Sequence, residues 1–240
     1  MEKKNQFSIV IPTLNESRNI GKLIKKINNV LKTHIYEIIV VDDNSEDGTK
    51  DILNQLNHDK RIKTVFRQKS KGLASAFLRG IVETSGDYIG WLDTNMSETA
   101  IRFKEMSNLL NSEYDIVILS RYIEGGGDQR NLLRALSSKY FNILCRIILS
   151  AKIKDFTTSI FLMKRKVLDE ATFLGYGHGD FFIEFLNNAY KKGFTIKEIP
   201  FVQKKDDELE VSKSAPNLIK FCYLGIMYVI RIFSTIMRRD

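Results

Sequence analysis

The strongest fold signal in this chain lies in two segments, Phe7-Ser-Ile-Val-Ile-Pro-Thr-Leu-Asn-Glu16 and Glu37-Ile-Ile-Val-Val-Asp-Asp-Asn-Ser45. In each segment a short run rich in β-branched residues ends abruptly in polar residues, which is typical of a buried strand in a parallel sheet. Between them, apolar residues recur at helical spacing from Ile20 to Leu31, and this predicts an amphipathic helix. Strand, helix and strand in this order form the repeating unit of an α/β fold.

The same alternation continues along the chain. Further strands are predicted at 61–66, 88–92, 115–119, 161–163 and 195–201. Further helices are predicted at 51–56, 73–84, 101–110, 132–149 and 181–191. We therefore expect an α/β fold with a mostly parallel central sheet flanked by helices.

The composition agrees with one globular domain. The chain has 240 residues, of which 43% are hydrophobic and 28% charged, and these values exclude a disordered, collagen-like or coiled-coil protein. The two cysteines, Cys145 and Cys222, lie in different apolar segments without metal-ligand spacing. This arrangement argues against both a disulfide framework and a zinc site.

The net charge of +8 indicates an anionic partner. Residues 211–240 hold five basic residues and one acidic residue around an apolar run, which favours a membrane surface over nucleic acid. The five basic residues are Lys213, Lys220, Arg231, Arg238 and Arg239.

The C-terminal segment Leu218 to Met237 is predicted to form an amphipathic helix. Lys220 and Arg231 limit its uninterrupted apolar run to Phe221–Ile230, which is short of the roughly 20 residues that cross a bilayer. We expect one globular domain at 1–213 and an apolar and basic, membrane-interfacial helix at 214–240. A helix packed on the core is the alternative. Because the first residues are polar and lack a signal-peptide pattern, a cytoplasmic protein peripheral to the membrane is expected.

Four motifs carry a resemblance to a known family. Val10–Glu16, Val40–Thr49 and Lys71–Ala76 resemble the nucleotide-sugar half of family 2 glycosyltransferases. The glycine-rich segment Ser120–Gly127 is similar to that of the dolichol-phosphate mannose synthase-like branch, the polyprenyl-phosphate glycosyltransferases. The resemblance covers residues 7–213 and implies that the domain at 1–213 has a GT-A glycosyltransferase fold. It also implies inverting transfer of a hexose, of mannose or glucose type, from a GDP- or UDP-linked sugar to a polyprenyl or dolichyl phosphate.

The donor site is expected where the strands of the parallel sheet end, because ligands bind beyond the carboxyl ends of such strands. Asp42 and Asp43 place two carboxylates at one strand end, an unfavourable arrangement unless a ligand or cation compensates it. Asn15 and Glu16 offer polar groups to a base or ribose, and capping the next helix is their alternative role. The candidate donor-binding residues are Pro12, Asn15, Glu16, Asp42, Asp43, Lys71 and Gly72.

Asp93-Thr-Asn95 stands where the family has its Asp-x-Asp motif, which implies Mg²⁺ or Mn²⁺ bridging the donor phosphates. Asn95 offers a carbonyl oxygen but no charge, so metal affinity should be lower than with a second aspartate. A non-catalytic binder of nucleotide sugars or lipid phosphates is therefore one alternative function.

The acceptor site rests on basic residues. The resemblance implies that Arg121, Arg134 and Ser138 contact the lipid phosphate, that Lys204 and Lys213 lie in a loop over the site, and that Asp93, Arg121 and Arg134 form the catalytic centre. A phosphate acceptor is already an anion and requires no general base. A sugar hydroxyl acceptor in surface glycan synthesis is the second alternative; it would need a carboxylate base, for which Asp180 is the candidate.

Overall fold

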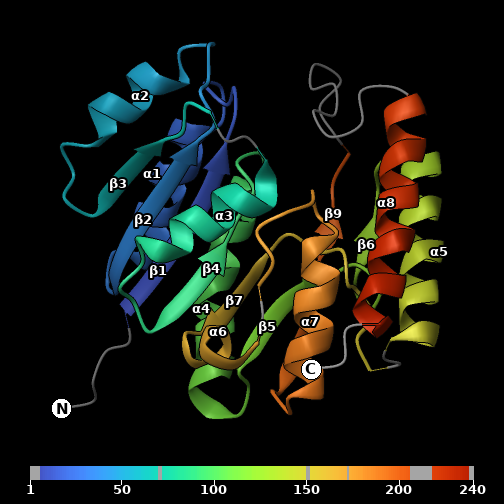
Figure 1. Cartoon of the computed structure of the whole chain (residues 1–240). Coiled ribbons are helices and arrows are strands. Elements are labelled where there is room, and N and C mark those ends of the chain that lie inside the picture. The colour runs from blue at the N-terminus through green and yellow to red at the C-terminus, as the bar shows by residue number, and fades with distance from the viewer. Residues whose placement is uncertain (1–5, 70–71, 150–151, 172, 206–217, 238–240) are drawn as a thin grey trace.

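The structure is a computed structural model that describes residues 6–69, 72–149, 152–171, 173–205 and 218–237. Seven strands form its main sheet: β1 Gln6–Thr13, β2 Ile35–Asp42, β3 Ile62–Phe66, β4 Tyr88–Trp91, β5 Ile116–Ser120, β7 Phe161–Lys164 and β8 Ile196–Pro200. Their order across the sheet is β3-β2-β1-β4-β7-β5-β8 (Figure 1). β7 runs antiparallel to β4 and β5, and the other pairings are parallel. The predicted mostly parallel sheet is confirmed.

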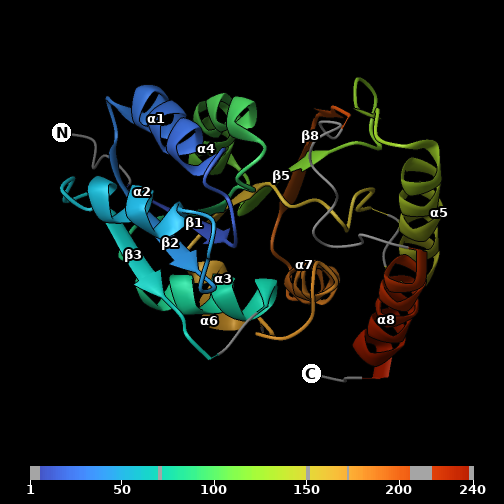
Figure 2. The same cartoon turned by 90° about the horizontal axis from the view of Figure 1, so that it is seen from above.

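Helices cover both faces of this sheet (Figure 2). They are α1 Ile20–Leu31, α2 Thr49–Leu56, α3 Leu73–Val82, α4 Arg102–Ser112, α5 Leu132–Ile148, α6 Lys166–Glu170, α7 Phe181–Lys191 and α8 Leu218–Met237, with a 3₁₀ helix η1 at Ser97–Ile101. Alternate residues of β1 enter different cores: Ile9 and Ile11 pack with α1 and α4, while Val10 packs with α3. This alternation follows from the two-residue period of a strand.

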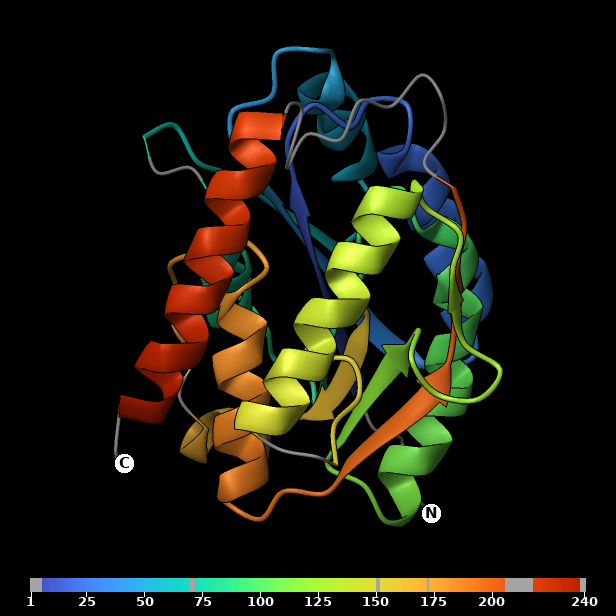
Figure 3. The ribbon, with the colours of Figure 1, turned by 90° about the vertical axis from the view of Figure 1, so that its right-hand side faces the viewer.

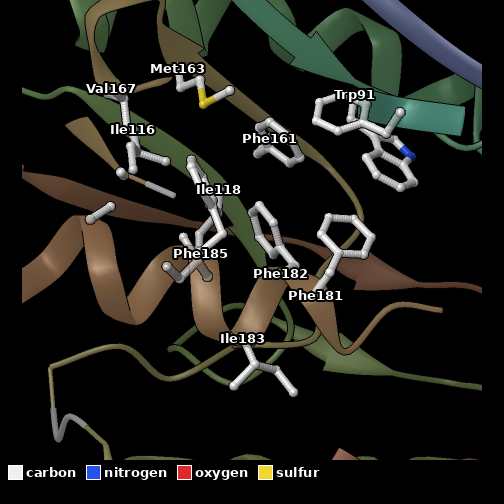
Figure 4. Close-up of a cluster of buried hydrophobic side chains, with 14 of the residues drawn as sticks. Trp91, Ile116, Ile118, Phe161, Met163, Val167, Phe181, Phe182, Ile183 and Phe185 are labelled. Atoms are coloured by element: carbon white, nitrogen blue, oxygen red, sulfur yellow. The ribbon is translucent and has the colours of Figure 1, made fainter. Parts of the chain in front are cut away.

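The core on the α3 and α7 face is rich in aromatic rings (Figure 4). Trp91 and Phe181 stack with ring centroids 5.3 Å apart, and Phe161 and Phe182 stack at 4.6 Å. All nine residues 181–189 of α7 are buried. A helix that is buried on every side is enclosed by other elements, and α7 accordingly lies between the sheet and the two outer helices α5 and α8 (Figure 2).

The C-terminal helix α8 packs on the domain. It contacts α7 and lies beside α5 (Figure 3), where the Phe141 and Tyr228 rings are 5.3 Å apart. One face of α8, with Arg231, Ile232 and Thr235, is buried. Among the described helices, none has the length and apolar content needed to cross a bilayer.

Four short elements were not predicted from the sequence. They are η1, α6 and the parallel pair formed by β6 Gly127–Asp128 and β9 Val202–Gln203. Two-residue strands and one-turn helices are too short to give a hydrophobic period. The β6–β9 pair nevertheless positions the glycine loop, as described below.

We expect Gly80→Ala to destabilise the protein, because α3 packs directly on β1 at this glycine. A β-carbon at residue 80 would overlap the Val10 side chain and lie 3.2 Å from Val41. Overpacking costs about 1–3 kcal/mol, of which the better helix propensity of alanine offsets up to about 1 kcal/mol. Urea unfolding should therefore show a free energy of unfolding lower by about 1–2 kcal/mol.

Gly21→Ala in α1 is the matched control. The nearest atom to a β-carbon there is 3.9 Å away, so only the propensity gain remains and stability should rise by up to about 1 kcal/mol. Equal stability changes in the two variants would contradict the close packing of α3 on β1.

Candidate active site

A cavity of about 1060 Å³ opens at the carboxyl ends of the parallel strands. Its walls come from the segments that follow β1, β2, β4 and β5, from the start of α3, and from the loop before β7. In a parallel sheet this edge is where the polar strand exits converge. The lining segments include 12–19, 72–73, 93–96 and 157–160.

The loops after β1 and β2 are tied together by side chains. Asn15 has a positive φ of 54°; its backbone N–H donates to Ser45 Oγ at 2.8 Å, and its Oδ1 accepts from the Glu46 N–H at 2.8 Å. Asp47 Oδ2 accepts from the Ser17 N–H at 3.0 Å. Burial raises the pKa of Asp47, but hydrogen bonds from Thr49 and Ser17 outweigh it and bring that pKa below its usual value. The loops after β1 and β2 are thus held in one arrangement.

Asp42 and Asp43 have different surroundings. Asp42 is fully buried and accepts hydrogen bonds from the Ser45 N–H and hydroxyl, and it does not line the cavity. Asp43 does line it; the carboxylate accepts from Arg67 Nε at 2.6 Å and from the Gly72 N–H at 2.8 Å. The structure therefore gives Asp42 the role of holding a turn, whereas Asp43 orders the edge of the cavity.

Most of the predicted donor residues meet at this cavity. Those that line it are Pro12, Asn15, Glu16, Asp43 and Gly72. Asp42 lies behind the wall, and Lys71 lies outside the described residues.

Asp93 and Asn95 also line the cavity, on the loop that follows β4. Asp93 is partly buried and accepts from Trp91 Nε1 at 3.0 Å. Burial, together with the nearby charge of Glu16, raises the pKa of Asp93, although hydrogen bonds from Ser159 and Trp91 act in the opposite direction. Asn95 is exposed to the cavity.

These two residues supply two oxygen ligands within one loop. In the described part of the chain, no group of three or more His, Cys, Asp and Glu side chains is placed to hold a metal ion. Mg²⁺ at nucleotide sites is commonly held by one or two carboxylates together with substrate phosphates. The Asp93–Asn95 loop therefore fits a metal whose remaining ligands come from a bound diphosphate and water.

Arg121, directly after β5, is held by a buried carboxylate. Its Nε donates to Asp155 Oδ2 at 2.8 Å, and its Nη2 donates to Asp155 Oδ1 at 2.8 Å and to Thr157 Oγ1 at 2.7 Å. Its Nη1 donates to Gln203 Oε1 at 3.2 Å. Burial disfavours the guanidinium charge, but Asp155 outweighs this effect and raises the pKa of Arg121. Arg121 thus lines the cavity as a fixed, permanently charged group.

The glycine loop encloses Arg121. A β-carbon on Gly126 would lie 2.7 Å from the Ser120 carbonyl oxygen and 2.8 Å from the Arg121 backbone, so only glycine fits at this position. The following residues, Gly127 and Asp128, pair with β9. The sequence motif after β5 is therefore explained by the close approach of two backbone segments.

Two further arginines line the cavity beyond this loop. Arg130 is held by Asp128, with Nε 2.9 Å from Oδ1. Arg134 lies on the first turns of α5. Ser138, one turn further, accepts from the Tyr122 hydroxyl at 2.7 Å and does not line the cavity.

Only one of the two loop lysines predicted over the site can be placed. Lys204 is exposed and is not among the lining residues, and Lys213 lies outside the described residues. The side chains of Lys220, Arg238 and Arg239 lie outside them as well.

The far wall of the cavity is formed by His178 and Gly179, in the loop before α7, and by Tyr228 of α8. Burial raises the pKa of Tyr228, so this phenol remains protonated at neutral pH. Behind the wall, Asp180 is 2% exposed and pairs with Arg231, with Nε 2.8 Å from Oδ2.

This pairing corrects two sequence-based interpretations. Arg231 was predicted to face an anionic membrane, and this is wrong, because the side chain is turned inward to Asp180 and to Glu184. Asp180 does not line the cavity and its carboxylate is neutralised by Arg231, so it is not placed to act as a general base.

Among the residues of the site that were missed in the sequence are Arg130, Ser159, Gly179 and Tyr228. Arg130 follows the glycine loop in an Asp-x-Arg pattern that could have marked it. Ser159 forms a hydrogen bond with Asp93. Gly179 contacts Tyr228, which lies about fifty residues further along the chain. These two contacts have no local sequence signal because they join separate loops and helices.

Comparison with known proteins agrees with this architecture. A model of glycosyl transferase family 2 matches residues 8–172. A dolichol-phosphate mannosyltransferase of Pyrococcus furiosus is 32% identical over 199 residues, which are 82% of this chain and 56% of that protein. A polyprenol monophosphomannose synthase of Mycolicibacterium smegmatis is 27% identical over 221 residues, covering 88% of this chain and 82% of the other. The chain thus spans little more than half the length of the Pyrococcus relative.

Among solved structures, a glucosyl-3-phosphoglycerate synthase from Mycobacterium tuberculosis has the same fold. It was crystallised with Mn²⁺, UDP and phosphoglyceric acid and superposes with a TM-score of 0.75 at 17% identity, covering 98% of this chain and 80% of that one. The sheet, with its helices on both faces, is of the GT-A type. Because the family model matches well over half of the sequence, this chain belongs to the family 2 glycosyl transferases.

Proposed function

We propose that the protein transfers a hexose from a nucleotide diphosphate sugar to a polyprenyl phosphate, with inversion at the sugar. One observation carries this proposal: the cavity is acidic on one side and basic on the other. The acidic side chains lie on the loops after β1, β2 and β4, and they are Glu16, Asp43, Asp47 and Asp93. Three of the four arginines that line the cavity in the described part of the chain, Arg121, Arg130 and Arg134, lie after β5 and on α5. The fourth, Arg18, lies on the loop after β1, among the more numerous acidic side chains.

The basic side suits a phosphate acceptor. Asp155 and Asp128, which pair with Arg121 and Arg130, are not among the lining residues, so guanidinium groups are what this wall presents. Planar guanidinium groups bind phosphate oxygens in bidentate fashion. The names of the two relatives, a dolichol-phosphate mannosyltransferase and a polyprenol monophosphomannose synthase, support the same acceptor class.

A sugar hydroxyl acceptor fits less well. Its oxygen must lose a proton as it attacks, which requires a nearby base. The lining carboxylates belong to the donor side, and Asp180 is buried against Arg231. A phosphate monoester oxygen is already negative and needs no base, so the arginine wall alone is sufficient to orient it.

The acidic side suits the donor. Asn15, Glu16 and Asp43 offer oxygen atoms that can accept hydrogen bonds from ribose hydroxyls and base N–H groups. Gly72, which also lines the cavity, directly precedes α3. Asp93 and Asn95 are the residues that would hold Mg²⁺ or Mn²⁺, which neutralises charge on a departing diphosphate when bound. The structural relative contains Mn²⁺ and UDP, which supports a divalent metal as cofactor here.

We further propose that α5 and α8 rest on the membrane that contains the acceptor. Both helices lie on the outer side of the molecule (Figure 3), and both contribute to the cavity wall through Arg134 and Tyr228. Exposed apolar side chains form a stripe on each helix, and large exposed patches of this kind mark interaction surfaces. On α8 the stripe is Ile219, Tyr223, Ile226, Ile230, Phe233 and Met237, with the exposed Val229 and Ile236 beside it, and on α5 it is Leu132, Leu133, Leu136, Tyr140, Ile143, Leu144 and Ile147.

A bilayer explains both the apolar surface and its position. An interfacial helix buries its apolar side in the acyl boundary while its opposite side stays with the protein. The α8 stripe recurs every three or four residues, which places it on one face of the helix, and Ile232 on another side enters the core. A lipid phosphate in such a membrane would reach the arginines without leaving the headgroup layer.

Asp93→Ala should abolish transfer while leaving the fold intact, because its carboxylate is the only charged ligand that the Asp93–Asn95 loop offers a metal. Asn95→Asp adds a second charged oxygen and should tighten Mn²⁺ binding. Transfer is measured as labelled hexose recovered in the lipid fraction, and Mn²⁺ affinity by calorimetry in the presence of nucleoside diphosphate.

The control for both variants is circular dichroism with thermal melting. Near-normal turnover in Asp93→Ala would show that the donor site is misplaced. Mn²⁺ affinity that does not change in Asn95→Asp would show that residue 95 does not face the metal.

Ile226→Glu should weaken binding to vesicles that contain anionic phospholipid. The side chain is 60% exposed in the middle of the α8 stripe, and burial of an isoleucine contributes about 1.5–3 kcal/mol. We expect at least about a tenfold loss of affinity in a sedimentation assay. Val82→Glu is the matched control, because Val82 is 73% exposed at the end of α3. Equal binding by the two variants would rule out α8 as the membrane-contacting helix.

A further inference from the structure

The buried face of α8 contains a charged residue whose contacts are unusually complete. The Arg231 side chain is 4% exposed. Its Nε and Nη2 each lie 2.8 Å from Asp180 Oδ2, and its Nη1 lies 3.1 Å from Glu184 Oε2. Nη2 also donates to the Tyr176 carbonyl at 3.1 Å, and the guanidinium lies over the Tyr176 ring at 4.3 Å.

These contacts fix the loop that precedes α7. Asp180 Oδ1 also accepts from the His178 N–H at 2.7 Å, so one carboxylate joins the loop backbone to α8. Gly177 has a φ of +102°, and a β-carbon there would lie 2.8 Å from Arg231 Nη2. The loop is therefore folded tightly around the guanidinium group.

The same loop forms a wall of the cavity. His178 and Gly179 line it, and so does Tyr228, which is three residues before Arg231 on α8. A β-carbon on Gly179 would lie 2.5 Å from the Tyr228 hydroxyl. The wall therefore has its observed shape only when α8 is docked in this register.

Apolar contacts alone do not select one register. The neighbouring contact between α7 and α8 uses side chains such as Ile232, and packing of this kind tolerates sliding and rotation better than a directional ion pair does. Replacing a buried ion pair with apolar residues of similar size is often neutral for stability, and specifying a register is the best-attested use of such pairs. Arg231 meets that description, because it bridges two carboxylates and a carbonyl oxygen.

We propose that Arg231 is a positioning residue for the acceptor: by holding Asp180 and Glu184 it sets α8 against residues 176–180, and so shapes the acceptor side of the cavity without touching the substrate. This role rests on the proposed transfer to a lipid phosphate. It makes α8 part of the active site as well as a membrane-facing element. The donor side, built from the loops after β1, β2 and β4, is independent of it.

The test compares Arg231→Met with wild type on a short-chain, water-soluble prenyl phosphate, so that membrane binding does not enter. Methionine keeps the apolar stem and removes the charge. We expect KM for the acceptor to rise at least about tenfold, with KM for the nucleotide sugar and the Kd for nucleoside diphosphate changed by less than about twofold. Arg231→Lys, which can still reach one carboxylate, should recover part of the loss.

Arg79→Met is the matched control, because Arg79 makes a partly exposed ion pair with Glu83, at the end of α3 and away from the cavity. It should leave all constants unchanged. If Arg231→Met does not fold, Asp180→Asn, which keeps the side-chain shape, must show the same selective rise in acceptor KM. Acceptor KM equal to wild type in the folded variant would overturn the proposal, as would an equal loss of donor binding.

Hydrogen exchange of residues 174–182 separates this inference from the proposed function. The His178 amide should exchange faster in Arg231→Met even if the wild-type protein transfers no sugar to a lipid phosphate, since the contact with Asp180 would be loosened. Faster exchange with no wild-type transfer would refute the proposed function and leave the positioning role in place. Unchanged exchange would refute the positioning role itself.

Discussion

The basic half of the cavity, which we propose binds the acceptor, depends on the buried ion pair between Arg121 and Asp155. Asp155 is fully buried and its backbone N–H donates to Glu198 Oε1 on β8 at 3.0 Å. Arg121 follows β5 directly, and through Gln203 it also reaches β9. One bidentate contact therefore joins the end of β5 to the loop before β7 and to the small β6–β9 sheet. Removing one partner of such a pair leaves an uncompensated buried charge and costs about 3–5 kcal/mol.

The acidic half, the proposed donor side, is built on a different principle. Its loops are held by short polar side chains at strand exits, such as Asn15 with Ser45 and Asp47 with Ser17. These contacts leave carboxylates facing the cavity, whereas the basic half buries its carboxylates behind arginines. The two halves therefore present opposite charges, which suits a cation-assisted diphosphate on one side and an incoming phosphate on the other. α8 adds a third constraint, because the contacts of Arg231 shape the wall that lies next to the apolar surface.

Much of this arrangement could be predicted from the sequence because it follows local patterns. The seven strands of the main sheet and the longer helices were recognisable from apolar runs and helical spacing, and the polar strand exits from their position after those runs. The different roles of Asp42 and Asp43 could not be predicted, because adjacent carboxylates at a strand end carry the same local signal. Arg231 was misinterpreted for a related reason. A single arginine in an apolar helix looks the same whether it faces lipid headgroups or two carboxylates that lie 47 and 51 positions away, and only the tertiary structure distinguishes the two.

The most direct test is the chemical nature of the product. The protein is incubated with labelled nucleotide sugars, a polyprenyl phosphate and Mn²⁺, and the organic-phase product is treated with mild acid. A sugar joined to a lipid through phosphate is acid-labile, so the label should enter the organic phase and mild acid should release it as free hexose. Label that resists mild acid would indicate a glycosidic bond to a hydroxyl acceptor, and absence of label with every donor would indicate a protein that binds without transferring. Either result would contradict transfer to a lipid phosphate.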